Sequence, residues 1–295
     1  MSAVPTAAAL RILIADGNER AARARHVAAT GRTSAQSYAA VVRALAPAAS
    51  CSLFAPADAD DGLPNGADLS AFDGLIFTGS TLKVAAGTPE VTRQLDLMRA
   101  AFVAGVPVFG SCWGVQVAAV VAGGEAGPNP RGPEYGFARR IVPTREGERH
   151  GQQHGLLARR GRAWDAPAIH SDAVVTPPPG AAVLAANGLL DVQAIEIRHG
   201  AGWFWGTQYH PELDLDELAA MLRLCAGEIA EAGFAADPAA VAGYADEIAA
   251  LSQADADGRR RLAWRHGLGP EVLEAEARRR EIGNFLARLG RDARG

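Results

Sequence analysis

Cysteine is scarce in this sequence, and its scarcity excludes disulfide-rich and zinc-cluster proteins. The chain has 295 residues and 3 cysteines, Cys51, Cys112 and Cys225. They are too few and too widely spaced for a disulfide framework or a cysteine-rich metal site. Because structural disulfides belong mainly to oxidising compartments, so small a number favours a reducing setting, and we expect a cytoplasmic protein.

Positive charge is not in excess, and long apolar runs are missing. The 29 basic residues, of which only Lys83 is a lysine, face 33 acidic ones, which gives a net charge of −4. Proteins that follow nucleic-acid phosphates usually carry a basic excess. No stretch reaches the roughly 20 apolar residues that cross a bilayer. We therefore expect a soluble protein with no nucleic-acid or membrane partner.

The first part of the chain predicts an α/β fold. Short apolar runs at 10–15, 74–78 and 107–110 are typical of buried strands, and helical segments lie between them. Strands that alternate with helices predict a doubly wound, mostly parallel sheet with flanking helices. The Arg-rich stretch 18–32 has no clean period, so we expect a loop or lid there.

The second part has a different texture. A loop rich in Gly and Pro is expected over 123–132. Strands and turns are expected from 136 to 209, followed by a helix over 214–232. Residues 235–295 are rich in Ala, Glu and Arg with a helical period, so we expect one domain over 1–234 and a helical extension over 235–295. Apolar residues of the extension need cover, either by folding back on the domain or by meeting another chain.

Cys112 stands in the sequence Gly-Ser-Cys-Trp-Gly, between an expected strand and an expected helix. This pattern is the thiol counterpart of the nucleophile elbow, in which small residues permit a sharp turn that exposes the nucleophile. The N-terminus of the following helix favours the thiolate. We therefore predict that Cys112 is a nucleophile, whereas Cys51 and Cys225 are better interpreted as core residues.

A nucleophilic thiol requires a base, and His210 is the best placed of the seven histidines. It ends an expected strand in Gly-Thr-Gln-Tyr-His-Pro-Glu, and Glu212 follows two residues later. A strand end holds the imidazole rigidly, and the carboxylate can turn back to orient it. These spacings predict a Cys112–His210–Glu212 triad.

Together the two motifs resemble the class I (triad) glutamine amidotransferases. The resemblance covers about residues 10–232, and the order of strand, Gly-x-Cys-x-Gly and His-Pro-Glu matches that family. It implies that Cys112 attacks the side-chain amide of glutamine and forms a thioester, which water hydrolyses to glutamate after ammonia leaves. Two positions depart from the pattern: the loop at 78–80 lacks the family's proline, and Tyr209 stands where phenylalanine is frequent.

The resemblance also implies further site residues. Backbone amides of Trp113 and of the Gly79-Ser80 loop are expected to bind the oxyanion. Gln116 is similar to the family's glutamine-contacting residue; the alternative is an amide on the solvent side of its helix. The remaining expected substrate-binding residues are His170, Ser171 and Asp172, which resemble the family's Ser-His-x-Asp stretch.

Two other segments leave alternatives open. The segment 129–136, which contains Glu134 and Gly136, resembles a Glu-x-Gly turn that some free-standing members place beside the site; the alternative is an ordinary surface hairpin. His150 and His154 have a spacing that binds zinc on a helix, but Gly151 and Gly155 disfavour a helix there. No phosphate-binding loop is visible either. We expect no metal and no cofactor.

Three functions remain open at this point. The favoured one is a free-standing glutaminase, a Cys-His-Glu amide hydrolase that passes ammonia to a separate synthase subunit or acceptor. The second is a hydrolase or transferase of the same fold that acts on another γ-glutamyl compound. The third is a catalytically silent binding module, against which the complete triad counts. We expect a small-molecule substrate, glutamine or another γ-glutamyl amide. The expected protein partner is a synthase subunit or a second copy of the chain.

Overall fold

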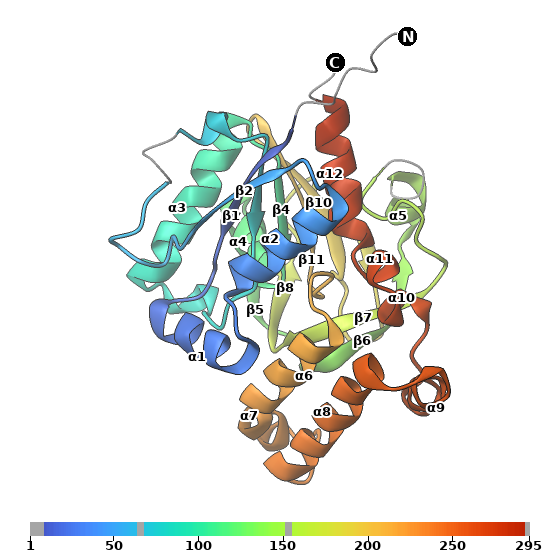
Figure 1. Ribbon diagram of the computed structural model, residues 1–295. Helices are drawn as coiled ribbons and strands as arrows, with labels where there is room; N and C mark the ends of the chain where they lie inside the picture. The colour runs from blue at the N-terminus through green and yellow to red at the C-terminus, as the bar shows by residue number, and fades with distance from the viewer. Residues whose placement is uncertain (1–8, 64–67, 151–154, 293–295) are drawn as a thin grey trace.

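The computed structural model describes residues 9–63, 68–150 and 155–292, and its centre is a large sheet with helices on both faces (Figure 1). The strand order is β2-β1-β3-β4-β11-β10-β9-β6-β7, and a second, small sheet pairs β5 with β8. This confirms the expected α/β fold class. The strands are β1 (Arg11–Ala15), β2 (Ser50–Phe54), β3 (Gly74–Phe77), β4 (Val108–Ser111), β5 (Glu125–Pro128), β6 (Glu134–Pro143), β7 (Trp164–His170), β8 (Asp172–Thr176), β9 (Ala182–Ala186), β10 (Ala194–His199) and β11 (Gly202–Thr207).

Helices connect and cover these strands, and the C-terminal part of the described chain is entirely helical apart from its short connections. Two short segments, η2 (Leu69–Ala71) and η3 (Val84–Ala86), are 3₁₀ turns. The α-helices are α1 (Arg20–Thr30), α2 (Ser34–Leu45), α3 (Pro89–Ala104), α4 (Trp113–Val121), α5 (Arg145–His150), α6 (Leu215–Leu224), α7 (Ala226–Glu231), α8 (Pro238–Gln253), α9 (Ala256–His266), α10 (Pro270–Leu273), α11 (Ala275–Arg278) and α12 (Arg280–Asp292).

The parallel half of the sheet explains the continuous apolar runs of the sequence. From β2 to β11 neighbouring strands are parallel, whereas the pairings from β11 to β7 are antiparallel. Successive side chains of a strand point to opposite faces. Ile12 and Ile14 accordingly join a core under α2 and α12, while Leu13 joins the core under α3 and α4. Because both faces of this half of the sheet are buried, polar and apolar residues do not alternate along its strands.

The parallel register brings three chain segments to one edge of the sheet. β4 lies between β3 and β11, with Phe77 opposite Gly110 and Ser111 opposite Thr207. Because the carboxyl ends of parallel strands meet at one edge, the segments that follow β3, β4 and β11 meet there as well. These segments carry Gly79, Cys112 and His210.

The helices after residue 235 fold back on the rest of the chain in two places. α8 packs on α6 in a third apolar cluster. α12 lies beside α2 on the sheet face, where Phe285 and Leu289 are buried in the main core (Figure 1). Trp264 on α9 remains 86% exposed. The division of the chain at residue 234 stays a prediction.

Three local expectations were wrong. Residues 20–30 form a helix instead of a loop or lid; it is held by ion pairs from Arg20 and Arg23 to Asp58, and buries Ala22 and His26. Because its buried face is so narrow, it leaves no clear period in the sequence. The helix expected over 214–232 is divided at Cys225 into α6 and α7, and the loop expected at 123–132 contains β5.

Within the described ranges, the helices are too short or too polar to cross a membrane.

Candidate active site

Cys112 occupies a sharp turn between β4 and α4. Its backbone has φ 49° and ψ −96°, a conformation that residues other than glycine rarely adopt. Neighbouring glycines make room for this turn. A Cβ on Gly110 would lie 2.9 Å from the Cα of Gly114, and a Cβ on Gly114 would lie 2.8 Å from the Cβ of Phe77. The elbow predicted from the sequence is therefore present in the backbone.

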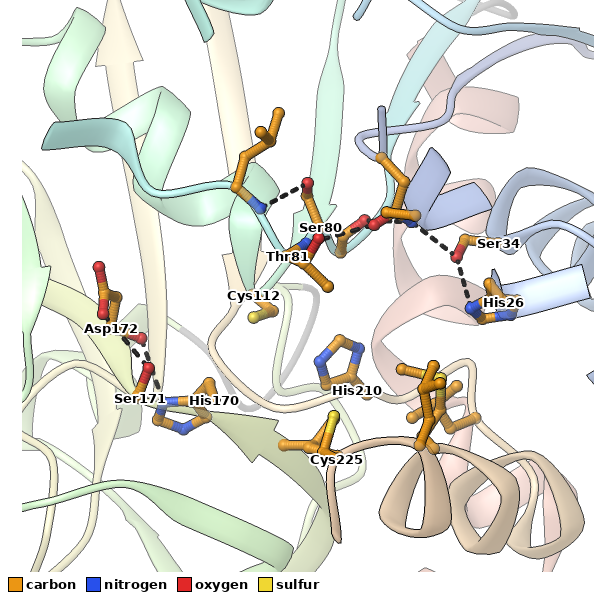
Figure 2. A pocket seen from close by; sticks show the side chains of 18 of the residues that line it. His26, Ser34, Ser80, Thr81, Cys112, His170, Ser171, Asp172, His210 and Cys225 are labelled. Carbon is orange, nitrogen blue, oxygen red and sulfur yellow. Dashed lines mark hydrogen bonds between the residues drawn. The ribbon is translucent and has the colours of Figure 1, made fainter. Parts of the chain in front are cut away.

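His210 and Glu212 follow β11 and line the same pocket as Cys112. His210 Nδ1 lies 2.7 Å from Glu212 Oε1, and both side chains are almost completely buried. The pocket has a volume of about 200 Å³. Figure 2 shows Cys112 and His210 near its centre; the labelled side chains around them are His170, Ser171 and Asp172 on one side and His26 and Ser34 on the other.

The surroundings of His210 favour its protonated form. Burial lowers the pKa of His210, but the Glu212 carboxylate and Cys112 raise it more, and the result is a pKa of about 10. His210 Nε2 has no hydrogen-bond partner among the described residues, and Figure 2 shows the ring beside Cys112. A buried imidazolium with one uncommitted N–H can donate a proton to a group in the pocket.

Gly79 approaches the imidazole closely. A Cβ on Gly79 would lie 2.8 Å from His210 Cε1, so any larger residue would displace the ring. Asn18 holds the loop in place, because its Oδ1 accepts a hydrogen bond of 3.2 Å from the Thr81 amide. Ser80 lines the pocket. The oxyanion role of Gly79, Ser80 and the Trp113 amide remains a prediction.

Four expected substrate-binding residues lie together in the pocket, and a fifth residue joins them. Gln116 is buried and donates a 3.0 Å hydrogen bond to the Asp172 carbonyl, so the solvent-facing alternative was wrong. Ser171 and Asp172 both accept hydrogen bonds from Lys83 Nζ, at 2.6 Å and 2.7 Å. Sequence reasoning missed Lys83, although its being the only lysine of the chain was a usable signal.

His170 is held by a buried polar cluster. Its Nε2 lies 3.0 Å from Glu134 Oε2 and its Nδ1 lies 3.2 Å from the Asp172 carbonyl. Gln193 and Asn187 also donate to the Glu134 carboxylate, and these donors together with His170 lower the pKa of Glu134 against the opposing effect of burial. The surface-hairpin alternative for Glu134 was wrong, because this side chain is buried. With both ring nitrogens committed, His170 is a poor candidate for the base.

The opposite wall of the pocket comes from α1, α6 and α7. His26 and Glu217 form a buried pair with 3.4 Å between Nε2 and Oε1, and Ser37 donates to Glu217 at 2.5 Å. Cys225 packs on the α6–α8 cluster and also lines this wall of the pocket. The sequence-based interpretation of Cys225 as a core residue was therefore only partly right. Burial and the nearby Glu228 raise the pKa of Cys225 to about 11, which keeps it a neutral thiol.

The histidine pair with zinc spacing cannot be placed as a unit, because His154 lies outside the described residues. Elsewhere in the ranges that the structure describes, no three His, Cys, Asp or Glu side chains converge as metal ligands do.

Comparison with known proteins places the chain in a family. The profile of the family "Glutamine amidotransferase class-I" matches residues 38–226, and the chain belongs to this family. A γ-glutamyl-L-1-hydroxyisopropylamide hydrolase from a Pseudomonas species is 37% identical over 227 residues, which is 76% of this chain and 75% of the relative. A glutamine-hydrolysing GMP synthase subunit from Ignicoccus hospitalis is 31% identical over 155 residues, covering 52% and 74% of the two chains.

Solved structures show the same fold. A glutamine amidotransferase from Thermotoga maritima matches with a TM-score of 0.62 at 14% identity, over 95% of this chain and 98% of that one. One from Methylobacillus flagellatus gives a TM-score of 0.55 at 18% identity, over 95% and 96%. These alignments extend well beyond residue 226, where the family profile ends.

Proposed function

We propose that this protein is a thiol hydrolase of γ-glutamyl amides, with Cys112 as nucleophile, His210 as proton carrier and Glu212 as the group that orients it. The observation that carries the proposal is the strained Cys112 turn beside the His210–Glu212 pair, in which Nδ1 and Oε1 are 2.7 Å apart. Family membership supports it.

The proposed reaction begins with a deprotonated Cys112 and a protonated His210. A thiolate of Cys112, stabilised by the His210 imidazolium and the N-terminus of α4, attacks the γ-carbonyl carbon. Amides of Trp113 and the Gly79-Ser80 loop would receive the oxyanion. His210 donates its Nε2 proton to the amide nitrogen, and the amine leaves. Water then gives a proton to His210 and its oxygen attacks the thioester, which releases glutamate and restores the thiolate.

Charges at one end of the pocket suit the glutamyl head group. An α-amino acid carries one ammonium and one carboxylate group, and Asp172 and Lys83 offer the complementary charges. These two side chains pair with each other at 2.7 Å, and a bound head group would replace that contact. Gln116, Ser171 and His170 border this end.

The apolar part of the pocket lining supports a substituted amide as the preferred substrate. It includes the side chains of Ile169, Leu213 and Met221. A small alkyl group on the amide nitrogen would be removed from water there, at roughly 0.8 kcal/mol per CH₂. The named activity of the Pseudomonas relative concerns such an amide, with a hydroxylated isopropyl group on nitrogen.

Hydrolysis of glutamine itself is the second candidate, because relatives over about half of this chain are subunits of glutamine-hydrolysing GMP synthases. In that case the ammonia would pass to a separate protein.

A substrate panel separates the two candidates. We expect kcat/KM for γ-glutamyl isopropylamide to exceed that for glutamine by about 10-fold or more, because the isopropyl carbons would be buried against the apolar side chains of the pocket. Glutamate release is measured for both amides and for the α-glutamyl isopropylamide isomer, with the Cys112→Ala protein as blank. A preference for glutamine would select the second candidate. Release from neither γ-amide would overturn the proposed function.

The pH profile tests the His210–Glu212 pair. The pKa of His210 is raised to about 10, so the imidazolium that protonates the leaving amine is present below that pH and lost above it. We expect kcat/KM, which reports the free enzyme, to fall as pH rises through about 10. Glu212→Gln removes a charge that raises this pKa, so its alkaline limb should move to lower pH with some activity retained. An unchanged limb in Glu212→Gln would contradict the assignment.

A further inference from the structure

Two hydroxyl groups from residues that do not line the pocket meet the Glu212 carboxylate. Ser111, directly before the nucleophile, donates from Oγ to Glu212 Oε1 at 3.1 Å. Tyr38 on α2 reaches Glu212 Oε2 at 3.0 Å and Ser111 Oγ at 2.6 Å. All three side chains are buried. Local sequence patterns contain no sign of this arrangement, because 73 residues separate Tyr38 from Ser111 and 174 separate it from Glu212.

A buried carboxylate needs hydrogen-bond donors on both oxygens. An oxygen that is removed from water without a hydrogen bond costs free energy. Glu212 Oε1 accepts hydrogen bonds from His210 Nδ1 and Ser111 Oγ, and Glu212 Oε2 accepts one from the Tyr38 hydroxyl. Removing the hydroxyl of Tyr38 or of Ser111 would loosen the carboxylate, because one hydroxyl instead of two would then hold its direction toward His210 Nδ1.

Tyr38 is suited to be the rigid member of this group. Its ring is completely buried and packs edge-on against Phe109 of β4, with ring centroids 6.5 Å apart. Burial, and then the Glu212 charge, raise the pKa of Tyr38 well above its usual value, so the hydroxyl keeps its proton and remains a donor. Its single proton serves either Ser111 or Glu212 at one time. In the first case Ser111 relays the donation to the carboxylate.

We propose that Tyr38 and Ser111 are positioning residues of the amide-hydrolysis reaction, acting on His210 through Glu212. This rests on the proposed function, in which His210 carries the proton. Donation to Glu212 has two consequences. It fixes the carboxylate that orients the imidazole, and it withdraws part of the negative charge that holds the proton on His210.

The test uses Tyr38→Phe, which removes the hydroxyl and keeps the ring. Because hydrogen bonds to charged groups are strong, we expect kcat to fall about 10-fold with little change in KM. The loss of a donor leaves more negative charge on Glu212, so the alkaline limb of kcat/KM should move to higher pH. That is opposite to the shift expected for Glu212→Gln. Ser111→Ala should act in the same direction, and the double variant should lose less than the product of the two single losses.

The matched control is Tyr244→Phe, which removes a hydroxyl from a partly buried tyrosine on α8, outside the pocket. It should keep kcat and the pH limb. Wild-type kcat and an unmoved limb in Tyr38→Phe would overturn the proposal. So would a loss in Tyr38→Phe that appears as a lower melting temperature with an unmoved limb, since that is a purely structural effect.

A second measurement needs no substrate and keeps the two proposals separable. Iodoacetamide alkylation of Cys112, located by mass spectrometry, is followed against pH in each variant, because the thiolate is the reacting form. A change of the alkylation profile in Tyr38→Phe, but not in Tyr244→Phe, supports the positioning role even if no γ-glutamyl amide is cleaved. Identical profiles in all variants, with normal cleavage, would retain the proposed function and reject the positioning role.

Discussion

Replacing Cys112 with alanine should reduce γ-glutamyl amide hydrolysis by at least about 10³-fold while leaving the fold intact. The reaction needs a covalent bond to sulfur, and no neighbouring group replaces it, because the raised pKa of Cys225 keeps that thiol protonated. Alanine also lacks the bulk that would disturb the turn between β4 and α4. Glutamate release measures the loss, and circular dichroism shows whether the fold is retained.

Cys51→Ala is the matched control for this experiment. Cys51 lies on β2, away from the pocket, and burial raises the pKa of its thiol. Its alanine variant should turn over within a few-fold of the parent. Residual activity of Cys112→Ala near the parent rate would end the thioester mechanism, and equal losses in both variants would point to a general effect of cysteine removal.

Local patterns predicted the centre of the site because its parts follow strands that lie side by side. The two motifs around Cys112 and His210 lie directly after β4 and β11, which are parallel neighbours in the sheet, so both motifs reach the same edge although other strands lie between them in the sequence. Lys83 and Glu134 were missed or left open because their partners come from distant segments. A single sequence contains no signal that a given lysine pairs with a given aspartate.

Helix prediction from the sequence failed in two ways. It missed a helix with a narrow buried face, and it did not show where another helix packs. α1 buries only Ala22 and His26, and ion pairs hold it to the loop after β2, so its own sequence is mostly polar. α12 shows the reverse: its apolar residues predicted a helix, but its place in the main core beside α2 was not predicted. Which surface covers an amphipathic helix depends on the whole topology.

A buried cluster of Arg160, Glu281 and Tyr209 joins α12 to the segment that carries His210. Arg160 contacts Glu281 through Nε and Nη2, each at 2.6 Å, and the Tyr209 hydroxyl donates to Glu281 Oε1 at 2.9 Å. Tyr209 is the residue where the family often has phenylalanine, and it directly precedes His210. Its extra hydroxyl is thus satisfied by a carboxylate from the region after 235.

Glu281→Gln should therefore lower the free energy of unfolding by about 3–5 kcal/mol, because Arg160 would keep a buried charge without its partner. The measurement is urea unfolding followed by tryptophan fluorescence. Glu276→Gln on the neighbouring helix α11 is the matched control: it faces Arg159 at 3.7 Å, both side chains are more than 70% exposed, and the change should stay within about 1 kcal/mol. A large loss in a single cooperative transition would mean that α12 belongs to the same unit as the site, against a division at residue 234. Equal, small effects of both substitutions would show that the buried pair does not hold α12 in place and would leave that division standing.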